Sequence, residues 1–350
     1  MIINKFKNYI ADISGFIFNL NRLISYRKDR YVLSYHRVIK EDMAIKDCMH
    51  HSLWVTPKLF ESHIAWMKNV GKIVNSEEFF SDSNHDGPLF LITFDDGWRD
   101  TYVSAFPILK KCNVPAMVFL ATEAVENGFL FWPQDIATKT MELFMSDHSQ
   151  QVVRAVIDCW PDYNGTNPPS NKHNAIDILY LWIEYLKYVD ESVRLNLISD
   201  YYDKLSLPQS PLLGYILNWD EIKEMRKNGI EFGSHTHRHV ILEDLSVDII
   251  GKELIQSKNI ISNQLQCEVS SLCYPNGRYS GLESDILHKC GYLYGFCLDN
   301  KSLRYRQDYF YVPRFIMNER NSRSEAYLKM RLLEAPLFRS KSHRPKMENM

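Results

Sequence analysis

The chain has 350 residues, of which 45% are hydrophobic and 24% charged, with a formal net charge of −2. This length suits one large domain, or a domain with a sizeable insertion. The near-neutral charge does not favour nucleic-acid binding, which needs clustered lysine and arginine. The seven cysteines are scattered and form no C-x-x-C pair, so neither a disulfide framework nor a thiolate zinc site is predicted.

The N-terminal segment 1–30 carries apolar residues at helical spacing and lacks the uninterrupted apolar core of a signal peptide. No run of about 18 apolar residues occurs, so no spanning helix is predicted. Two interpretations stay open: an amphipathic helix packed on its own domain, or an interfacial helix whose residues 1–28 contact a membrane. We expect a cytoplasmic protein, in the second case peripheral to the inner face of the membrane.

From residue 31 onward, short strand-like runs alternate with helical patterns, which is typical of β/α repeats around a parallel sheet or barrel. Strands are predicted at 31–39, 89–94, 116–121, 230–234, 270–274, 294–298 and 311–316. Helices are predicted from Thr56-Pro57 onward, and at 220–227, 246–264 and 282–289. Gly229 follows the helix at 220–227, and Gly291 follows the helix at 282–289.

The strand pattern stops between residues 130 and 211, where two helix-rich stretches occur at 175–188 and 192–204. We therefore predict an α/β domain that is discontinuous in sequence and interrupted by a helical insertion. We predict an amphipathic N-terminal helix at 1–30 and an α/β domain in two halves, at 31–129 and 212–318. The insertion is predicted at 130–211, and a C-terminal helix with a basic tail at 319–350.

Two adjacent carboxylates, Asp95 and Asp96, follow the apolar strand candidate 89–94. Buried carboxylates are costly unless a cation meets them, and parallel α/β folds place their active sites at this end of the strands. Because neighbouring side chains of a strand point in opposite directions, one Asp can face a metal while the other faces a substrate. The alternative is a turn whose Asp caps the next helix.

Three histidines fall within the five residues 235–239, directly after another strand candidate. His235 and His239 are four apart, so both can converge on one metal from a helical turn, whereas His237 would point elsewhere. One Asp and two His leave an open position for water, as catalytic metal sites do. A surface cluster without a metal is the alternative.

TFDDG (93–97) and HTHRH (235–239) resemble the first two motifs of the polysaccharide deacetylase family, also called the NodB-homology domain. The resemblance covers residues 31–123 and 215–317 and implies a distorted (β/α) barrel that removes acetyl groups from sugars. It also implies Asp95 as the base and Asp96, His235 and His239 as ligands of a divalent metal. Zinc is the default for a His-rich site.

A weaker resemblance links residues 272–277 to the family's third motif, which shapes one wall of the groove. A backbone N–H from Tyr274–Gly277, which includes Asn276, could contribute to the oxyanion hole. Trp98 and Tyr274 are predicted aromatic residues of the groove. Many members have an arginine at the position of Cys273, where it orients the catalytic Asp. Arg314 resembles an arginine that other members use for this charge, although a surface or ion-paired arginine fits equally well.

YHRV (35–38) is similar to the N-terminal segment of exopolysaccharide-type deacetylases, which are circularly permuted relative to other members. The resemblance implies that His36 replaces the late histidine of the family and protonates the leaving amine. Without the resemblance, a histidine that ends an apolar strand is more often a core or edge residue.

The implied reaction removes an N-acetyl group from a sugar or glycan in cell-surface polysaccharide assembly. The expected partner is an N-acetylated saccharide, with lipid-linked and nucleotide-linked acceptors both open. Two other classes are a metal-dependent hydrolase of another C–N bond and a non-catalytic glycan-binding member of the fold. The intact carboxylate and histidine set argues against the second, but fold and metal do not fix the substrate.

Overall fold

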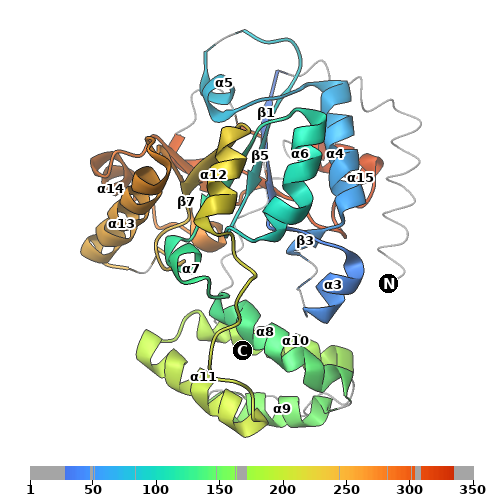
Figure 1. The fold of residues 1–350 in the computed structure, drawn as a ribbon, viewed down its shortest axis with the longest axis vertical. Helices are drawn as coiled ribbons and strands as arrows, with labels where there is room; N and C mark the ends of the chain where they lie inside the picture. Colours follow the sequence, from blue (N-terminus) through green and yellow to red (C-terminus); the bar gives the residue numbers. More distant parts are fainter. Residues whose placement is uncertain are drawn as a thin grey trace. The chain divides into compact units, whose positions relative to one another are not determined.

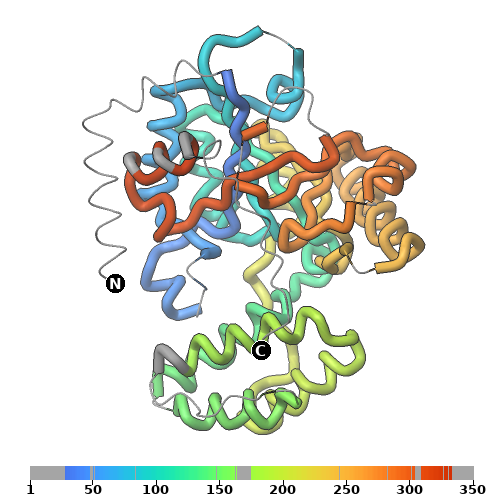
Figure 2. The backbone as a smooth tube through the Cα atoms, turned by 180° about the vertical axis from the view of Figure 1, so that it is seen from behind, coloured from blue at the N-terminus to red at the C-terminus, as the bar shows by residue number. Residues whose placement is uncertain are grey.

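A computed structural model describes residues 28–334, except for 48–49, 51, 83, 147, 162, 164–171, 244, 282, 301 and 304–308. The described residues form two compact units (Figures 1 and 2). The first comprises residues 28–40, 50–128 and 214–334, and the second comprises 41–47 and 129–213. Residues 1–27 of the predicted N-terminal helix, and the basic tail after Glu334, lie outside the described residues.

The first unit is built on one parallel sheet (Figure 1). Its strands, in spatial order, are β10 (Val312–Pro313), β9 (Tyr294–Cys297), β8 (Ser271–Cys273), β7 (Ile230–Ser234), β6 (Ala116–Leu120), β5 (Leu89–Phe94), β1 (Arg30–Tyr35) and β11 (Phe315–Ile316). A short strand, β4 (Lys72–Ile73), also pairs with β5. A separate parallel pair joins β2 (Arg37–Val38) to β3 (Trp54–Val55).

The two ends of this sheet belong to one short stretch of chain. Strands β10 and β11 lie at opposite edges in the spatial order, yet only Arg314 separates them in sequence. The sheet therefore curls into a nearly closed barrel whose two edges meet at Arg314. The prediction of a distorted (β/α) barrel is confirmed.

Helices cover the barrel (Figure 1). They are α4 (Pro57–Val70), α5 (Ser76–Phe80), α6 (Phe106–Cys112), α7 (Thr122–Asn127), α12 (Trp219–Lys227), α13 (Val247–Leu265), α14 (Glu283–Lys289) and α15 (Glu325–Glu334). Helix α4 begins as predicted, because the Thr56 side chain accepts a hydrogen bond from the N–H of Leu59 and proline occupies the first turn. Every residue of β1 and β5 is buried, as expected for parallel strands covered on both faces.

Two predicted strands are interrupted in the structure. The prediction of one strand over 31–39 is wrong at His36, where β1 ends before β2 begins, and the prediction over 311–316 is wrong at Arg314. Both residues leave the backbone ladder at the same end of the barrel. No helix among the described residues has the length and apolar character needed to cross a membrane.

The second unit is helical. It contains α3 (Glu41–Lys46), α8 (Trp132–Met145), α9 (Ser149–Asp158), α10 (Lys172–Leu186) and α11 (Glu191–Leu205). Its own core includes Ile136, Phe144 and Trp182. The sequence pattern predicted α10 and α11 but missed α8 and α9, and it gave no sign that α3 belongs with them. The helical insertion is confirmed as a feature of the fold.

Candidate active site

The predicted site residues gather at the carboxyl ends of the barrel strands. His36 follows β1, Asp95 and Asp96 follow β5, and His235 follows β7. Cys273 is the last residue of β8, and Arg314 lies between β10 and β11. Parallel strands end at a common edge, so residues that are more than 200 positions apart in sequence meet here.

Asp96, His235 and His239 converge on one point. The Asp96 Oδ1 atom lies 3.3 Å from His235 Nε2 and 3.2 Å from His239 Nε2. One ligand atom from each residue lies within 4.8 Å of the other two. The backbone of Asp96 is in the left-handed region, with φ of 73°, and Gly97 follows with φ of 82°. Such strained backbone at a non-glycine residue is typical of functional sites.

Hydrogen bonds with neighbouring groups orient the side chains of His235 and Asp96 so that they can bind a cation. The Nδ1 atom of His235 lies 2.8 Å from the backbone carbonyl of Cys273. A carbonyl can only accept, so Nδ1 carries the proton and the neutral ring presents the Nε2 lone pair to the site. The indole N–H of Trp98 donates to Asp96 Oδ2 at 2.8 Å, which leaves Oδ1 to face the histidines. The donor set therefore fits a divalent metal ion.

Asp96 and His235 each shift the pKa of the other. Burial would raise the pKa of Asp96, but hydrogen bonds from His235 and His239 hold that pKa well below its ordinary value. Burial would lower the pKa of His235, but Cys273, Asp96 and Asp95 raise it well above its ordinary value. Each partner thus stabilises the charged form of the other. A metal ion would displace the shared proton.

Asp95 is held by Arg314. The guanidinium donates from Nη1 to Oδ1 at 2.7 Å and from Nη2 to Oδ2 at 2.8 Å. Arg314 is fully buried, so the alternative of a surface arginine is wrong. Burial would raise the pKa of Asp95, but the charge and hydrogen bonds of Arg314 lower it to about 2. Asp95 is therefore ionised across the physiological range.

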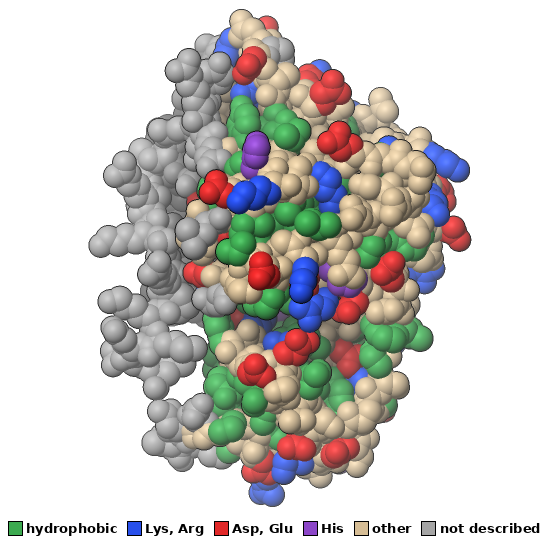
Figure 3. All heavy atoms as spheres, turned by 90° about the vertical axis from the view of Figure 1, so that its left-hand side faces the viewer, with side chains coloured by type: hydrophobic (Ala, Val, Ile, Leu, Met, Phe, Trp, Pro, Cys, Tyr) green, Lys and Arg blue, Asp and Glu red, His purple; other side chains and the backbone are tan. Residues whose placement is uncertain are grey.

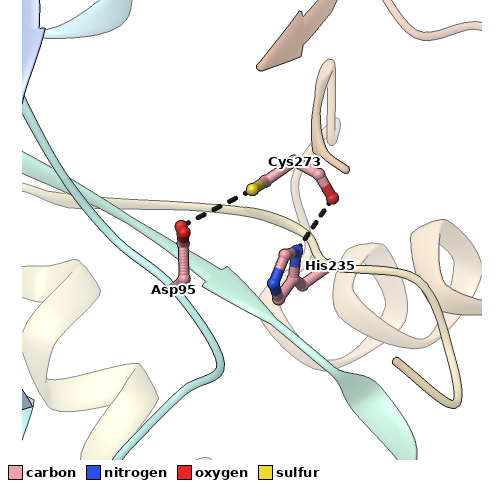
Figure 4. A group of neighbouring side chains, drawn as sticks. All are labelled: Asp95, His235 and Cys273. Atoms are coloured by element: carbon pink, nitrogen blue, oxygen red, sulfur yellow. Dashed lines mark hydrogen bonds between the residues drawn. The ribbon is translucent and has the colours of Figure 1, made fainter. Parts of the chain in front are cut away.

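A second group of residues could offer metal ligands. Ligand atoms of Asp95, His235 and Cys273 also lie within 4.8 Å of one another, and Figure 4 shows the Cys273 sulfur directed towards Asp95 and its carbonyl towards His235. However, Arg314 Nη2 lies 2.9 Å from the Cys273 sulfur. Burial raises the pKa of this thiol, and only a thiolate is a good ligand. The group with Asp96 is therefore the better metal site.

His36 also lies close to Asp95. Its Nε2 atom is 3.8 Å from Asp95 Oδ2, and its side chain is 13% exposed. Its Nδ1 atom is buried and has no hydrogen-bond partner among the described residues.

The three residues predicted to face substrate or oxyanion differ in position. Trp98 is buried behind Asp96, and Tyr274 is buried with its hydroxyl donating to the carbonyl of Phe310. The N–H of Tyr274 donates to the carbonyl of Phe296, and the N–H of Gly277 donates to Tyr274. Asn276 is exposed with φ of 56°, and its N–H takes no part in the two backbone hydrogen bonds that Tyr274 and Gly277 donate. Their roles stay predictions.

The sequence patterns missed Ser34, whose hydroxyl donates to Asp95 Oδ2 at 3.3 Å. Ser34 pairs in register with Thr93, whose hydroxyl accepts from Arg314 at 3.2 Å. Both are polar residues inside apolar strands, and that contrast was the signal available in the sequence.

The fold and the site define the class of protein. The sequence model of the family described as polysaccharide deacetylase matches residues 82–157 and 188–295, more than half of the chain. The chain belongs to this family. The predicted class of enzyme, a carbohydrate N-deacetylase, is therefore confirmed as the activity of its family.

Individual relatives are distant. The Bacillus subtilis protein YxkH is 22% identical over 250 residues, which is 70% of this chain and only 59% of that protein. The poly-β-1,6-N-acetyl-D-glucosamine N-deacetylase of Staphylococcus epidermidis is 23% identical over 321 residues, covering 85% of this chain and 82% of the relative.

Solved structures share the fold. The deacetylase PplD of Streptococcus pyogenes, determined with acetate, has a TM-score of 0.56 and 19% identity, covering 88% of this chain and 97% of that one. IcaB of Ammonifex degensii has a TM-score of 0.55 and 17% identity, covering 87% and 97%.

Proposed function

We propose that this protein is a zinc-dependent hydrolase that removes acetyl groups from the N-acetylglucosamine units of a β-1,6-linked polysaccharide. One observation carries the proposal: Asp96, His235 and His239 converge at 3.2–3.3 Å, while the adjacent Asp95 is held ionised by Arg314. The two carboxylates thus have separate environments and separate tasks. The name of the staphylococcal relative supports the choice of sugar and linkage.

Asp96, His235 and His239 would hold the metal ion. When bound there, such an ion polarises the acetyl carbonyl and lowers the pKa of a water molecule towards neutrality. Zinc fits two imidazoles and one carboxylate, with an open position for that water.

Asp95 accepts the proton of the attacking water. Arg314 donates to both oxygens of Asp95, and the Ser34 hydroxyl makes a longer bond of 3.3 Å to Oδ2, so a water that approaches Oδ2 would take the place of the Ser34 hydroxyl. The bidentate contact also fixes the orientation of the carboxylate, which matters because general base catalysis needs hydrogen-bond geometry with the water.

His36 donates a proton to the departing amine. The distance of 3.8 Å between His36 Nε2 and Asp95 Oδ2 supports this assignment, because acid and base must both reach one reacting group. Asn276, on the turn after β8, supplies a backbone N–H to the developing oxyanion. Acetate and a free amino sugar are the products.

The test is acetate release from β-1,6-linked N-acetylglucosamine oligomers by the zinc-loaded protein, with β-1,4-linked oligomers in parallel. Asp96→Asn and His239→Ala should lose bound zinc and nearly all activity. His288→Ala, a histidine change on the exposed face of α14, is the control and should retain both. Zinc binding without acetate release from either oligomer would refute the substrate, and full activity of Asp96→Asn would refute the metal site.

We further propose a cytoplasmic, lipid-linked acceptor, with residues 1–28 making a peripheral membrane contact. The apolar residues at helical spacing in this segment support the contact. Sedimentation with anionic phospholipid vesicles, comparing the full chain with a chain that lacks residues 1–28, tests it. Equal binding of both would refute it.

A further inference from the structure

The turn that carries the two histidine ligands is strained. Thr236 has φ of 64° and His239 has φ of 57°, both in the left-handed region that non-glycine residues rarely adopt. Thr236 is β-branched and fully buried, which makes the conformation more costly. Such a turn persists only when surrounding contacts impose it. Without them His235 and His239 would not keep their ring centroids 4.8 Å apart.

Glu253 of helix α13 imposes this conformation. Its Oε2 atom accepts from the backbone N–H groups of His237 at 3.0 Å and Arg238 at 2.9 Å. Its Oε1 atom accepts from Arg238 Nε at 2.6 Å. Helix α13 lies on the face shown in Figure 3, where basic, acidic and apolar side chains are interspersed, but Glu253 is on the inner side of the helix and only 4% exposed. Its neighbour Lys252 is exposed.

His237, the middle histidine of the segment, supports the same turn. Its Nδ1 atom is hydrogen-bonded to Thr122 Oγ1 at 2.9 Å, and its Nε2 atom to the Gln256 amide at 2.8 Å. Its carbonyl accepts from the N–H of Glu123. The ring is thus tied to α7 and α13 and is not among the residues that converge with Asp96.

We propose that Glu253 is a positioning residue that holds the His235–His239 turn in its metal-binding conformation, with the ring of His237 as its second anchor. The proposal rests on the proposed function, because it takes His235 and His239 as ligands. Removing the acceptor leaves two adjacent N–H groups without their carboxylate, so the turn relaxes and the two imidazoles diverge. Changes to partners behind metal ligands typically weaken metal binding by about 10–100-fold.

The experiment measures zinc affinity of the full chain by competition with a chromophoric chelator. Glu253→Ala should weaken zinc binding by about 10–100-fold, whereas Glu253→Gln, which keeps an oxygen for the two N–H groups, should stay within about fivefold of the unchanged protein. Glu283→Ala is the matched control. Glu283 is also buried and accepts two successive backbone N–H groups, those of Ser280 and Gly281, at 2.7 and 2.8 Å. It should lose stability but not zinc affinity.

Thermal unfolding in EDTA shows whether each variant is folded without metal. If Glu253→Ala is not folded, Thr122→Val decides, because it removes the bond to the His237 ring at almost constant volume and should weaken zinc binding about threefold or more. Unchanged affinity in folded Glu253→Ala, or in Thr122→Val in that case, overturns the proposal. Failure of the unchanged protein to bind zinc would instead overturn the proposed function.

Discussion

Replacing Arg314 by methionine tests the electrostatic design of the site. The guanidinium is fully buried and donates to both oxygens of Asp95, to Thr93 and to the carbonyl of Cys297. Methionine keeps much of the apolar volume but none of these donors. Asp95 would then be a buried carboxylate without its cation.

The size of the effect follows from the pKa of Asp95. Its value of about 2 lies below the ordinary 3.8, so the site favours the charged form by about 2.5 kcal/mol even after the cost of burial. Breaking a buried ion pair by removing one partner typically costs about 3–5 kcal/mol. We therefore expect Arg314→Met to lower the free energy of unfolding by about 3–5 kcal/mol at pH 7.

The pKa of Asp95 also determines how the free energy of unfolding changes with pH. In the unchanged protein the contribution of Asp95 is fully present above pH 3.8 and is lost as the pH falls through 2. In Arg314→Met, only the weaker effects of His36 and His235 still oppose burial, so we expect the pKa of Asp95 to rise above its ordinary value. As the pH falls, protonation of Asp95 removes the unpaired buried charge of the variant. The difference in free energy of unfolding between the two proteins therefore becomes smaller below about pH 5.

Urea unfolding in the presence of EDTA, at pH 7 and pH 4, measures this gap. Arg30→Met is the control, since Arg30 is also buried and donates to a neutral acceptor, the carbonyl of Ser81, at 2.6 Å. It should show no narrowing. A gap below about 1 kcal/mol at pH 7, or one that is the same at both pH values, would refute the role assigned to Arg314.

Two further changes separate catalysis from folding. His36→Ala should lower the rate of acetate release by about 10²–10⁴-fold while zinc content stays the same, and a wild-type rate from pH 6 to 8 would remove the acid from the scheme. Burial lowers the pKa of His63 to about 4, so the unfolded chain gains a proton below pH 6.5 that the folded chain does not take up. Stability should therefore fall by about 3 kcal/mol from pH 7 to pH 4, and His63→Gln, compared by urea unfolding, should lack this component; equal slopes would contradict it.

The sequence predicted best those features that depend on neighbouring residues. The apolar run 89–94 and its abrupt end at two carboxylates defined β5 and its functional end. Thr56-Pro57 marked the start of α4. The spacing of His235 and His239 indicated convergence, although the structure achieves it with left-handed backbone at Thr236 and His239, not with a regular helical turn.

Features set by distant contacts were beyond such patterns. Trp98 was expected at the groove, but its indole N–H is satisfied by Asp96, two residues away, and a sequence does not show which partner a buried donor finds. Glu253 sits in a helix like any amphipathic one, and only the fold brings its carboxylate under the histidine turn. Helix α3 belongs with α8–α11 although more than 80 residues separate it from them.

Arg314 shows how barrel closure and chemistry are coupled. The residue leaves the ladder between β10 and β11, where the two edges of the sheet meet, and its side chain enters the barrel beside Asp95. Its Nη2 atom lies 2.9 Å from the Cys273 sulfur, so the guanidinium already occupies the space next to residue 273. An arginine at position 273 would bring a second buried cation to one carboxylate. The cysteine at this position is therefore compatible with an ionised Asp95, because the stabilising charge arrives from the closing strands instead of from β8.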